Sequence, residues 1–463
     1  MISTQQRSYI QVHGDRFLEE LKEFLRIPSV TTAPQHAEDV RRAAQFVREK
    51  LLAAGLDRAE LLGTAGNPLV YAEKIIDSSL PTVLLYGHYD VQPADPYELW
   101  DHPPFEPTIK RGRIYARGAS DDKGQVYLHI KALETILSTG ALPCNVKVLI
   151  EGEEEVGSGN LALFLKDEKN QALLQTDAII VSDSAFLSPE QPAIIMSLRG
   201  ITAFDITLTG PSRDLHSGVY GGAVANPLNV LCKMIAALHD QDGRISIPGF
   251  YDQVLEPDDA LKATLAQMPF DLDHYQQGIE TEAITGEVGY STVERTGIRP
   301  ALDVNGIWGG YTGHGPKSII PAEAHAKLSI RLAPCQEVAQ VTAQFKSYLT
   351  SLTPHGMQLS MQVHQGDNAV VFDSQAPAVA AASKAFETIW HKRPIFTREG
   401  ASIPILAAFQ QTLRCNNIAM MGFGLESDAI HAPNEHFVLS HFYKGIETVV
   451  TFYQEFAKLH NAK

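Results

Sequence analysis

The stretch Val83-Leu84-Leu85-Tyr86-Gly87-His88-Tyr89-Asp90 decides the fold, because a short apolar run ends directly in a histidine and an acid. Two further apolar runs end in the same way, residues 146–150 before the acids of 151–155, and residues 178–181 before Ser182-Asp183. Short apolar runs separated by helical patterns are typical of strands in a mostly parallel sheet. The carboxyl ends of such strands face the ligand crevice of an α/β protein. We therefore expect an α/β fold that gathers these polar side chains at one edge of its sheet.

Acids gathered at one edge repel one another unless a cation neutralises them, so a divalent-metal site is the first hypothesis. Four donors fit it, with a second histidine required from elsewhere in the chain: His88, Asp121, Glu155 and Asp183. Zinc accepts histidine nitrogen and carboxylate oxygen, and catalytic sites keep a position open for water. Two metals about 3.5–4 Å apart can share a bridging carboxylate and a bridging hydroxide.

Two acids next to these donors suit other tasks. Glu154 precedes a ligand and is placed to act as the general base that passes a proton from water to the leaving nitrogen. Asp90 lies two residues after His88, on the same face of a strand. From there it can accept the other imidazole N–H and fix the tautomer of the ring.

Composition excludes several classes of protein. The 38 Lys and Arg against 54 Asp and Glu give a formal net charge of −16, whereas a nucleic-acid binder needs basic patches. The four cysteines form no CxxC pair, so neither a disulfide framework nor a zinc ribbon is indicated. No apolar run reaches membrane-spanning length, and residues 1–7 lack the apolar core of a signal peptide. We expect a cytoplasmic protein with no nucleic-acid or membrane partner.

Helical periodicity marks much of the chain outside the strands. Apolar stripes predict helices at about 17–25, 40–52 and 121–138. Ser120 or Asp121 would begin the third of these helices, where free backbone N–H groups and the helix dipole favour a carboxylate.

The pattern changes after about residue 197. Four segments have the character of an α+β domain, with strand alternation at 201–210 and 326–332 and helical periodicity at 227–239 and 335–352. At 463 residues the chain exceeds one usual core, so two domains are expected. We place an inserted domain at 198–375, between the two parts of a first domain at 1–197 and 376–463.

The motifs resemble those of the M20 family of dizinc peptidases and amidohydrolases. This family includes carnosine dipeptidases, bacterial dipeptidases, aminoacylases and succinyl-diaminopimelate desuccinylase. Five motifs carry the resemblance, in order along nearly the whole chain: residues 87–93, 117–124, 151–158, Ser182-Asp183 and 430–435. The resemblance implies Asp121 as the bridging ligand, Glu154 as the base and His431 as the last ligand. Zinc is the expected metal, with manganese or cobalt as alternatives.

The resemblance also implies a catalytic domain, a mixed, mostly parallel sheet flanked by helices, interrupted by a smaller lid domain that mediates dimerisation. His216 lies in a motif similar to that of the carnosinase-like branch, where it would stabilise the oxyanion in the active site of a partner subunit. Arg331 and Ser402 resemble the groups that hold the free carboxylate of the substrate, a task for which the planar guanidinium is suited.

Three neighbours compete with the chosen ligands. Asp122 competes with Asp121. Because Glu153, Glu154 and Glu155 are consecutive, the assignment of base and ligand could be shifted by one residue, and Glu153 would then take one of the two roles. The last ligand has a rival in His436, five residues after His431.

The expected activity is that of a metal-dependent exopeptidase, a dipeptidase that cleaves dipeptides with a free C-terminal carboxylate through a metal-bridging hydroxide. An amidohydrolase of N-acyl or N-carbamoyl amino acids is the rival within the same chemistry. A non-catalytic metal-containing binding module is the rival from another class.

Overall fold

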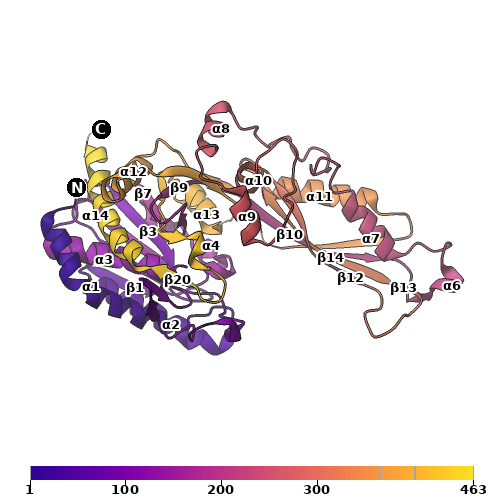
Figure 1. Cartoon of the computed structure of the whole chain (residues 1–463), viewed down its shortest axis with the longest axis horizontal. Coiled ribbons are helices and arrows are strands. Elements are labelled where there is room, and N and C mark those ends of the chain that lie inside the picture. The colour runs from indigo at the N-terminus through magenta and orange to yellow at the C-terminus, as the bar shows by residue number, and fades with distance from the viewer. Residues whose placement is uncertain (1, 365, 401–402, 462–463) are drawn as a thin grey trace. The chain divides into compact units, whose positions relative to one another are not determined.

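The computed structural model describes residues 2–364, 366–400 and 403–461 (Figure 1). The chain divides into two compact units. Unit 1 comprises Met1–Met196, Phe372–Thr397 and Ile403–Lys463, and unit 2 comprises Ser197–Val371 and Arg398–Ser402.

A mixed sheet runs through unit 1. Its strands follow one another in the order β1 (Arg58–Leu62), β2 (Leu69–Lys74), β6 (Asn145–Glu151), β3 (Thr82–His88), β7 (Ala178–Val181), β18 (Ile418–Met420) and β9 (Ala193–Leu198). The short strands β16 (Val370–Val371) and β17 (Ile395–Glu399) also pair with β9. The four central strands β6, β3, β7 and β18 are parallel, and the pairs β1–β2, β2–β6, β18–β9 and β16–β9 are antiparallel. The predicted α/β fold with a mixed sheet flanked by helices is confirmed, and its parallel part is the centre of the sheet.

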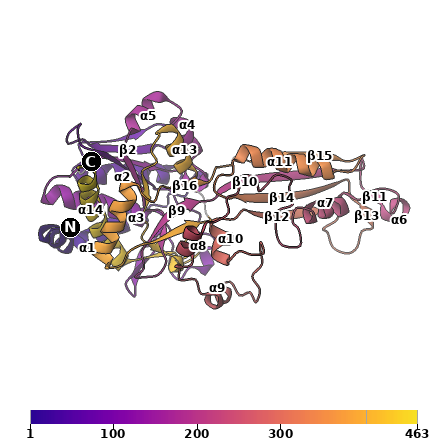
Figure 2. The same cartoon turned by 90° about the horizontal axis from the view of Figure 1, so that it is seen from above.

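Helices cover both faces of this sheet, which explains why its central strands are continuous apolar runs. On β3, the Tyr86 ring meets Phe409 of α13 (Pro404–Thr412) edge-on at 5.3 Å. A side chain at the next residue, Gly87, would lie 2.6 Å from Val126 of α3 (Lys123–Thr139). Successive residues of β3 therefore face opposite helical layers. Figure 2 shows α13 with α4 (Gly159–Phe164) and α5 (Glu168–Leu174) on one side of the sheet.

The other layer contains α3 together with the helices from both ends of the chain. These are α1 (Thr4–Leu25), α2 (Ala37–Ala53), α12 (Pro377–Trp390) and α14 (Leu439–Asn461). The helices predicted at 17–25, 40–52 and 121–138 are confirmed. The predicted start of the third was wrong, because α3 begins at Lys123 and its N-cap is Asp122, whose side chain makes no capping bond. Neither Ser120 nor Asp121 caps α3; the loop that contains them is held by other partners.

Unit 2 is an α+β structure. Its antiparallel sheet has the order β12 (Ala301–Gly309), β14 (Glu323–Leu332), β10 (Gly200–Thr209) and β15 (Gln358–Val363). The helices α7 (Pro227–Ala236) and α11 (Val338–Leu352) pack on one face and form a core with alternate residues of β10 and β14. Between α7 and β12 lie α8 (Asp259–Leu265), α9 (Leu272–Gly278) and α10 (Thr292–Gly297). The two-residue strands β11 (Leu215–His216) and β13 (Ile319–Ile320) pair beside α6 (Ser217–Tyr220). In the described residues of both units, helices fall short of the length and apolar character that a membrane crossing needs.

Candidate metal centre

The ends of three parallel strands in unit 1 bring three of the predicted ligands together. His88 is the last residue of β3 and pairs with Glu151 at the end of β6, and the chain then enters the 3₁₀ turn Glu154–Val156, which contains Glu155. Asp183 follows β7, which lies on the other side of β3. Parallel pairing therefore aligns these groups at one edge of the sheet.

Asp121 and His431 reach this edge from loops far apart in the sequence. Asp121 lies just before α3, and His431 lies between the 3₁₀ turn Glu426–Asp428 and β20 (His436–Val438). The Asp121 carboxylate stands between the two imidazoles. Its Oδ1 is 3.0 Å from Nε2 of His88, and its Oδ2 is 2.9 Å from Nε2 of His431.

The five side chains form two overlapping groups. In one, ligand atoms of His88, Asp121 and Asp183 all lie within 4.8 Å of one another, and in the other the same holds for Asp121, Glu155 and His431. Nε2 of His431 is 3.1 Å from Oε2 of Glu155, and Nε2 of His88 is 3.9 Å from Oδ2 of Asp183. Asp121 belongs to both groups, as a bridging ligand would.

The charges at this edge show a strong preference for cations. Hydrogen bonds to Asp121 and Glu155 raise the pKa of His431 to about 10. Burial alone would lower the pKa of His88, but hydrogen bonds to Asp121 and Asp90 outweigh it and raise that pKa well above its usual range. The carboxylates thus favour positive charge on both rings, which is the field that a divalent ion would meet.

The donor set fits divalent metal ions. Each group offers one imidazole nitrogen and two carboxylates, and three protein ligands with an open position are typical of catalytic zinc. This edge of unit 1 is therefore a candidate metal-binding site.

Glu154 lies beside both groups. Burial, together with the negative charges of Asp183, Asp121 and Glu155, raises its pKa well above the usual range of a carboxyl group, although His88 opposes this effect. A carboxyl group whose proton affinity is raised in this way is suited to accept a proton from water.

Asp90 is buried beneath the turn that contains Glu154. Its two carboxylate oxygens accept the backbone N–H groups of Glu154 and Glu155, both at 3.3 Å. Nδ1 of His88 lies 3.1 Å from the carbonyl oxygen of Asp90 and 3.4 Å from Oδ1 of its carboxylate. Asp90 therefore contacts the ring of one predicted ligand and the backbone of the predicted base.

The structure also places the rivals of the chosen residues. Asp122 accepts the backbone N–H of His88 at 3.2 Å and stands outside both groups. Glu153 accepts hydrogen bonds from the amide of Asn160, and the ring of His436 packs at a tilt against Tyr115.

Two functional candidates were missed by the sequence reasoning. Gln92 donates to Oε2 of Glu155 at 2.8 Å, and Glu435 accepts hydrogen bonds from the loop that contains Asp121. Each lies four residues after a candidate ligand histidine, inside a motif that was already recognised. Their place inside these motifs was the only sequence signal that could have pointed to either residue.

The remaining predicted residues belong to unit 2. His216 is exposed just before α6, where its Nδ1 accepts the backbone N–H of Gly218 at 3.0 Å. Arg331 lies half-buried on β14, on the sheet face opposite the α7 and α11 core, and burial lowers its pKa. Within residues 2–364, 366–400 and 403–461, its guanidinium has neither a hydrogen-bond nor an ion-pair partner. Ser402 lies outside the described residues.

Known proteins with similar sequences and structures are metallopeptidases, in agreement with the candidate metal-binding site. The sequence profile of peptidase family M20/M25/M40 matches residues 84–455. The Cys-Gly metallodipeptidase dug1 of Schizosaccharomyces pombe is 32% identical, over 96% of each chain. The Beta-Ala-His dipeptidase of Rattus norvegicus is 30% identical, over 98% of this chain and 96% of its own. The M20 family metallo-carboxypeptidase Sso-CP2 from Sulfolobus solfataricus has a similar structure, with a TM-score of 0.85 and 31% identity over 96% of this chain and 99% of its own.

The match covers most of the chain and includes the five motifs from which the resemblance was stated. That resemblance is confirmed, and this chain belongs to peptidase family M20/M25/M40.

Proposed function

We propose that this protein is a metal-dependent dipeptidase that hydrolyses dipeptides with a free C-terminal carboxylate. One observation carries the proposal: the two oxygens of Asp121 face different histidines, in two ligand groups beside the half-buried Glu154. The names of the relatives, two dipeptidases and a metallo-carboxypeptidase, support a small peptide with a free carboxyl end as substrate.

We infer two zinc ions as the cofactor, bound by His88, Asp121 and Asp183 and by Asp121, Glu155 and His431, with manganese or cobalt as alternatives. Divalent ions bound there would polarise the scissile carbonyl and make water more acidic.

The side chains of unit 1 then move the proton. Glu154 accepts it from the attacking water and delivers it to the leaving nitrogen as the C–N bond breaks, so one carboxylate serves as base and then as acid. Asp90 holds the backbone of Glu154 and the ring of His88, and thereby orients the base relative to the ligands.

Unit 1 would be the catalytic domain and unit 2 an inserted lid domain. Arg331 would bind the carboxylate of the substrate, and Ser402 would assist it. Among the described residues the Arg331 guanidinium has no hydrogen-bond or ion-pair partner, and Asp303 is a negative charge in its surroundings. His216 would reach the active site of a partner subunit and donate to the oxyanion, since its side chain is exposed at the start of the short helix α6. Four free thiols support a location in the cytoplasm.

A substrate panel tests the proposed activity. Protein dialysed against chelator and reloaded with Zn²⁺, Mn²⁺ or Co²⁺ should hydrolyse free dipeptides and release both amino acids, and the chelated protein should not. Preferential cleavage of N-acyl or N-carbamoyl amino acids would replace the proposal with the amidohydrolase. Full metal loading with no hydrolysis of either class would favour a binding module.

A homodimer through unit 2 is supported by the edge strand β12. Val304, Ile307 and Trp308 on this strand are between 41% and 46% exposed, and exposed apolar edge strands tend to pair with other chains. Trp308→Glu should therefore shift a dimer to a monomer in sedimentation velocity at micromolar concentration. Tyr97→Glu, at a 49% exposed aromatic residue of unit 1, is the matched control and should remain dimeric. A wild-type protein that sediments as a monomer would contradict the dimer itself.

A further inference from the structure

Glu435 is a fully buried carboxylate that the proposed chemistry does not use. It lies four residues after His431 and faces the loop that leads to Asp121, more than 300 positions earlier in the chain. A buried carboxylate is costly unless its oxygens are hydrogen-bonded, so its partners indicate what it does.

Both oxygens of Glu435 accept two hydrogen bonds each. Oε2 accepts from Nη1 of Arg117 at 2.7 Å and from the backbone N–H of Gly118 at 2.9 Å. Oε1 accepts from the backbone N–H groups of Ser120 at 3.0 Å and Asp121 at 3.1 Å. Hydrogen bonds to an ionised acceptor are the strong ones. The four that Glu435 accepts all come from residues 117–121, and we call this set of hydrogen bonds the clamp.

We propose that Glu435 is a positioning residue, which fixes the Asp121 backbone and the His431 loop as one preformed scaffold for metal binding. The inference rests on the proposed role of Asp121 and His431 as ligands. It adds a carboxylate that binds no metal and acts through the backbone of a ligand that does.

The loop that contains His431 needs such an anchor. Ala429, His431 and Asn434 all adopt left-handed backbone conformations, with φ of 56°, 59° and 66°. Residues with a Cβ occupy this region at a cost and remain there only where their surroundings fix them. The loop is fixed at both ends, because Asp428 at its start accepts the hydroxyl of Ser120 at 3.0 Å and Glu435 holds its end. Both anchors reach the same segment before α3.

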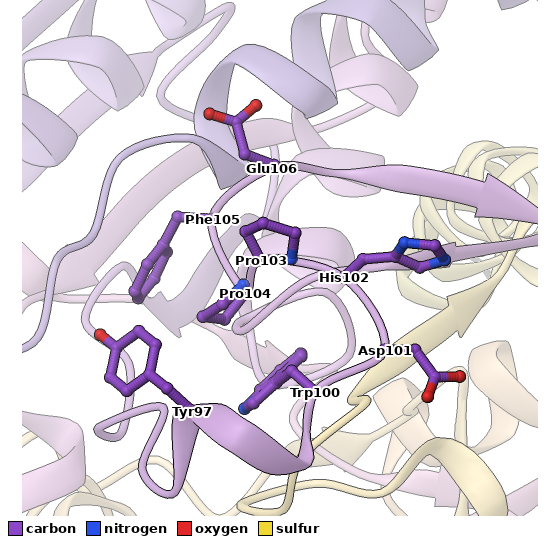
Figure 3. Close-up of a pocket in the computed structure, with 8 residues that line it drawn as sticks. All are labelled: Tyr97, Trp100, Asp101, His102, Pro103, Pro104, Phe105 and Glu106. Atoms are coloured by element: carbon purple, nitrogen blue, oxygen red, sulfur yellow. The ribbon is translucent and has the colours of Figure 1, made fainter.

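Hydrogen bonds from the same two segments also reach a third loop, residues 93–101. Nη2 of Arg117 donates to the carbonyl oxygen of Pro93 at 3.1 Å, and its guanidinium stacks over Trp100 at 5.5 Å. Asn434 accepts the backbone N–H of Asp101 at 2.8 Å and donates to the carbonyl oxygen of Leu99. Tyr97, Trp100 and residues 101–106 line a pocket of about 460 Å³. Figure 3 shows their side chains. The clamp around Glu435 thus also fixes the segment that follows His88 and Asp90.

Glu435→Gln tests the proposal with a side chain of the same size. The amide nitrogen would be a donor facing donors, so one half of the clamp is lost. Loss of a partner that orients a ligand typically weakens metal binding by about 10–100-fold. We expect a loss of this size for Co²⁺ in equilibrium dialysis, with a changed visible spectrum of the bound Co²⁺ and an unchanged circular dichroism spectrum.

Glu287→Gln is the matched control. Glu287 is a 5% exposed carboxylate of unit 2 that accepts from Nε and Nη2 of Arg299 at 2.9 and 2.8 Å. The Glu287→Gln variant removes a buried, arginine-paired charge from unit 2, whereas all five predicted ligands belong to unit 1, so its Co²⁺ affinity should equal that of the wild type. A folded Glu435→Gln with wild-type Co²⁺ affinity would overturn the positioning role. A wild-type protein that binds no Co²⁺ would instead overturn the proposed function.

A measurement on the wild type covers the case in which Glu435→Gln does not fold. A preformed clamp should protect the amides of Gly118, Ser120 and Asp121 from hydrogen exchange equally in chelator-treated and Co²⁺-loaded protein. Rapid exchange of these amides after chelation would mean that the metal orders the loop, and the proposal would fail.

Discussion

Glu154→Gln is expected to lower kcat by about 10²–10⁴-fold while the protein still binds its full complement of metal, because the variant removes only the group that accepts the proton. The two side chains have nearly the same size and the backbone N–H of residue 154 can still donate to Asp90, so the turn should keep its place. Burial and the charges of Asp183, Asp121 and Glu155 already favour a neutral side chain at position 154, so the folded protein should lose no stability.

Steady-state kinetics on a dipeptide, with metal content measured on the same preparation, check this expectation. Glu153→Gln is the adjacent control, because the Glu153 carboxylate contacts Asn160 and should tolerate the change with near wild-type kcat. Equal loss in both variants would point to damage of the turn, and full activity of Glu154→Gln would remove Glu154 from the role of base.

Asp121→Asn is expected to abolish tight binding of both metal ions, whereas Asp183→Asn should weaken only one. The reason is that Asp121 belongs to both ligand groups, with one oxygen near each histidine, while Asp183 belongs to one. An amide supplies a single neutral oxygen, and its nitrogen would face the other ion as a donor.

Metal content after dialysis against a fixed free Zn²⁺ concentration separates the two outcomes. The wild type should retain about two ions per chain, Asp183→Asn about one and Asp121→Asn close to none, following the number of ligand groups that each variant breaks. Retention of two ions by Asp121→Asn would show that Asp121 is not the shared ligand, and Asp122 would become the next residue to test.

The sequence predicted those ligands that follow directly from strand geometry. His88 ends an apolar run and Asp183 follows another, and parallel pairing of β3 with β7 makes the carboxyl ends of both strands neighbours. No periodicity connects His431 with Asp121, because their proximity depends on a loop between two short elements. Only the resemblance of the motifs supplied that ligand.

The start of α3 shows how tertiary contacts override a local signal. An acid beside an expected helix start suggested a capping role for Ser120 or Asp121. In the structure, the backbone N–H groups of both residues donate to Glu435, so the helix begins only at Lys123. In unit 2, the stretch before β12 forms the helices α8, α9 and α10, of six or seven residues each, which are too short to show a clear helical period.

The position of β18 has a consequence for how the protein is made. This strand lies between β7 and β9 in the sheet, although it is synthesised after both of them and after the whole of unit 2. A chain still on the ribosome therefore exposes two unpaired strand edges in the middle of its largest sheet, the kind of surface that joins chains together. A premature stop before Ile418 would remove a central strand together with His431 and Glu435. Such a fragment would lack both the strand that connects β7 with β9 and a complete metal centre.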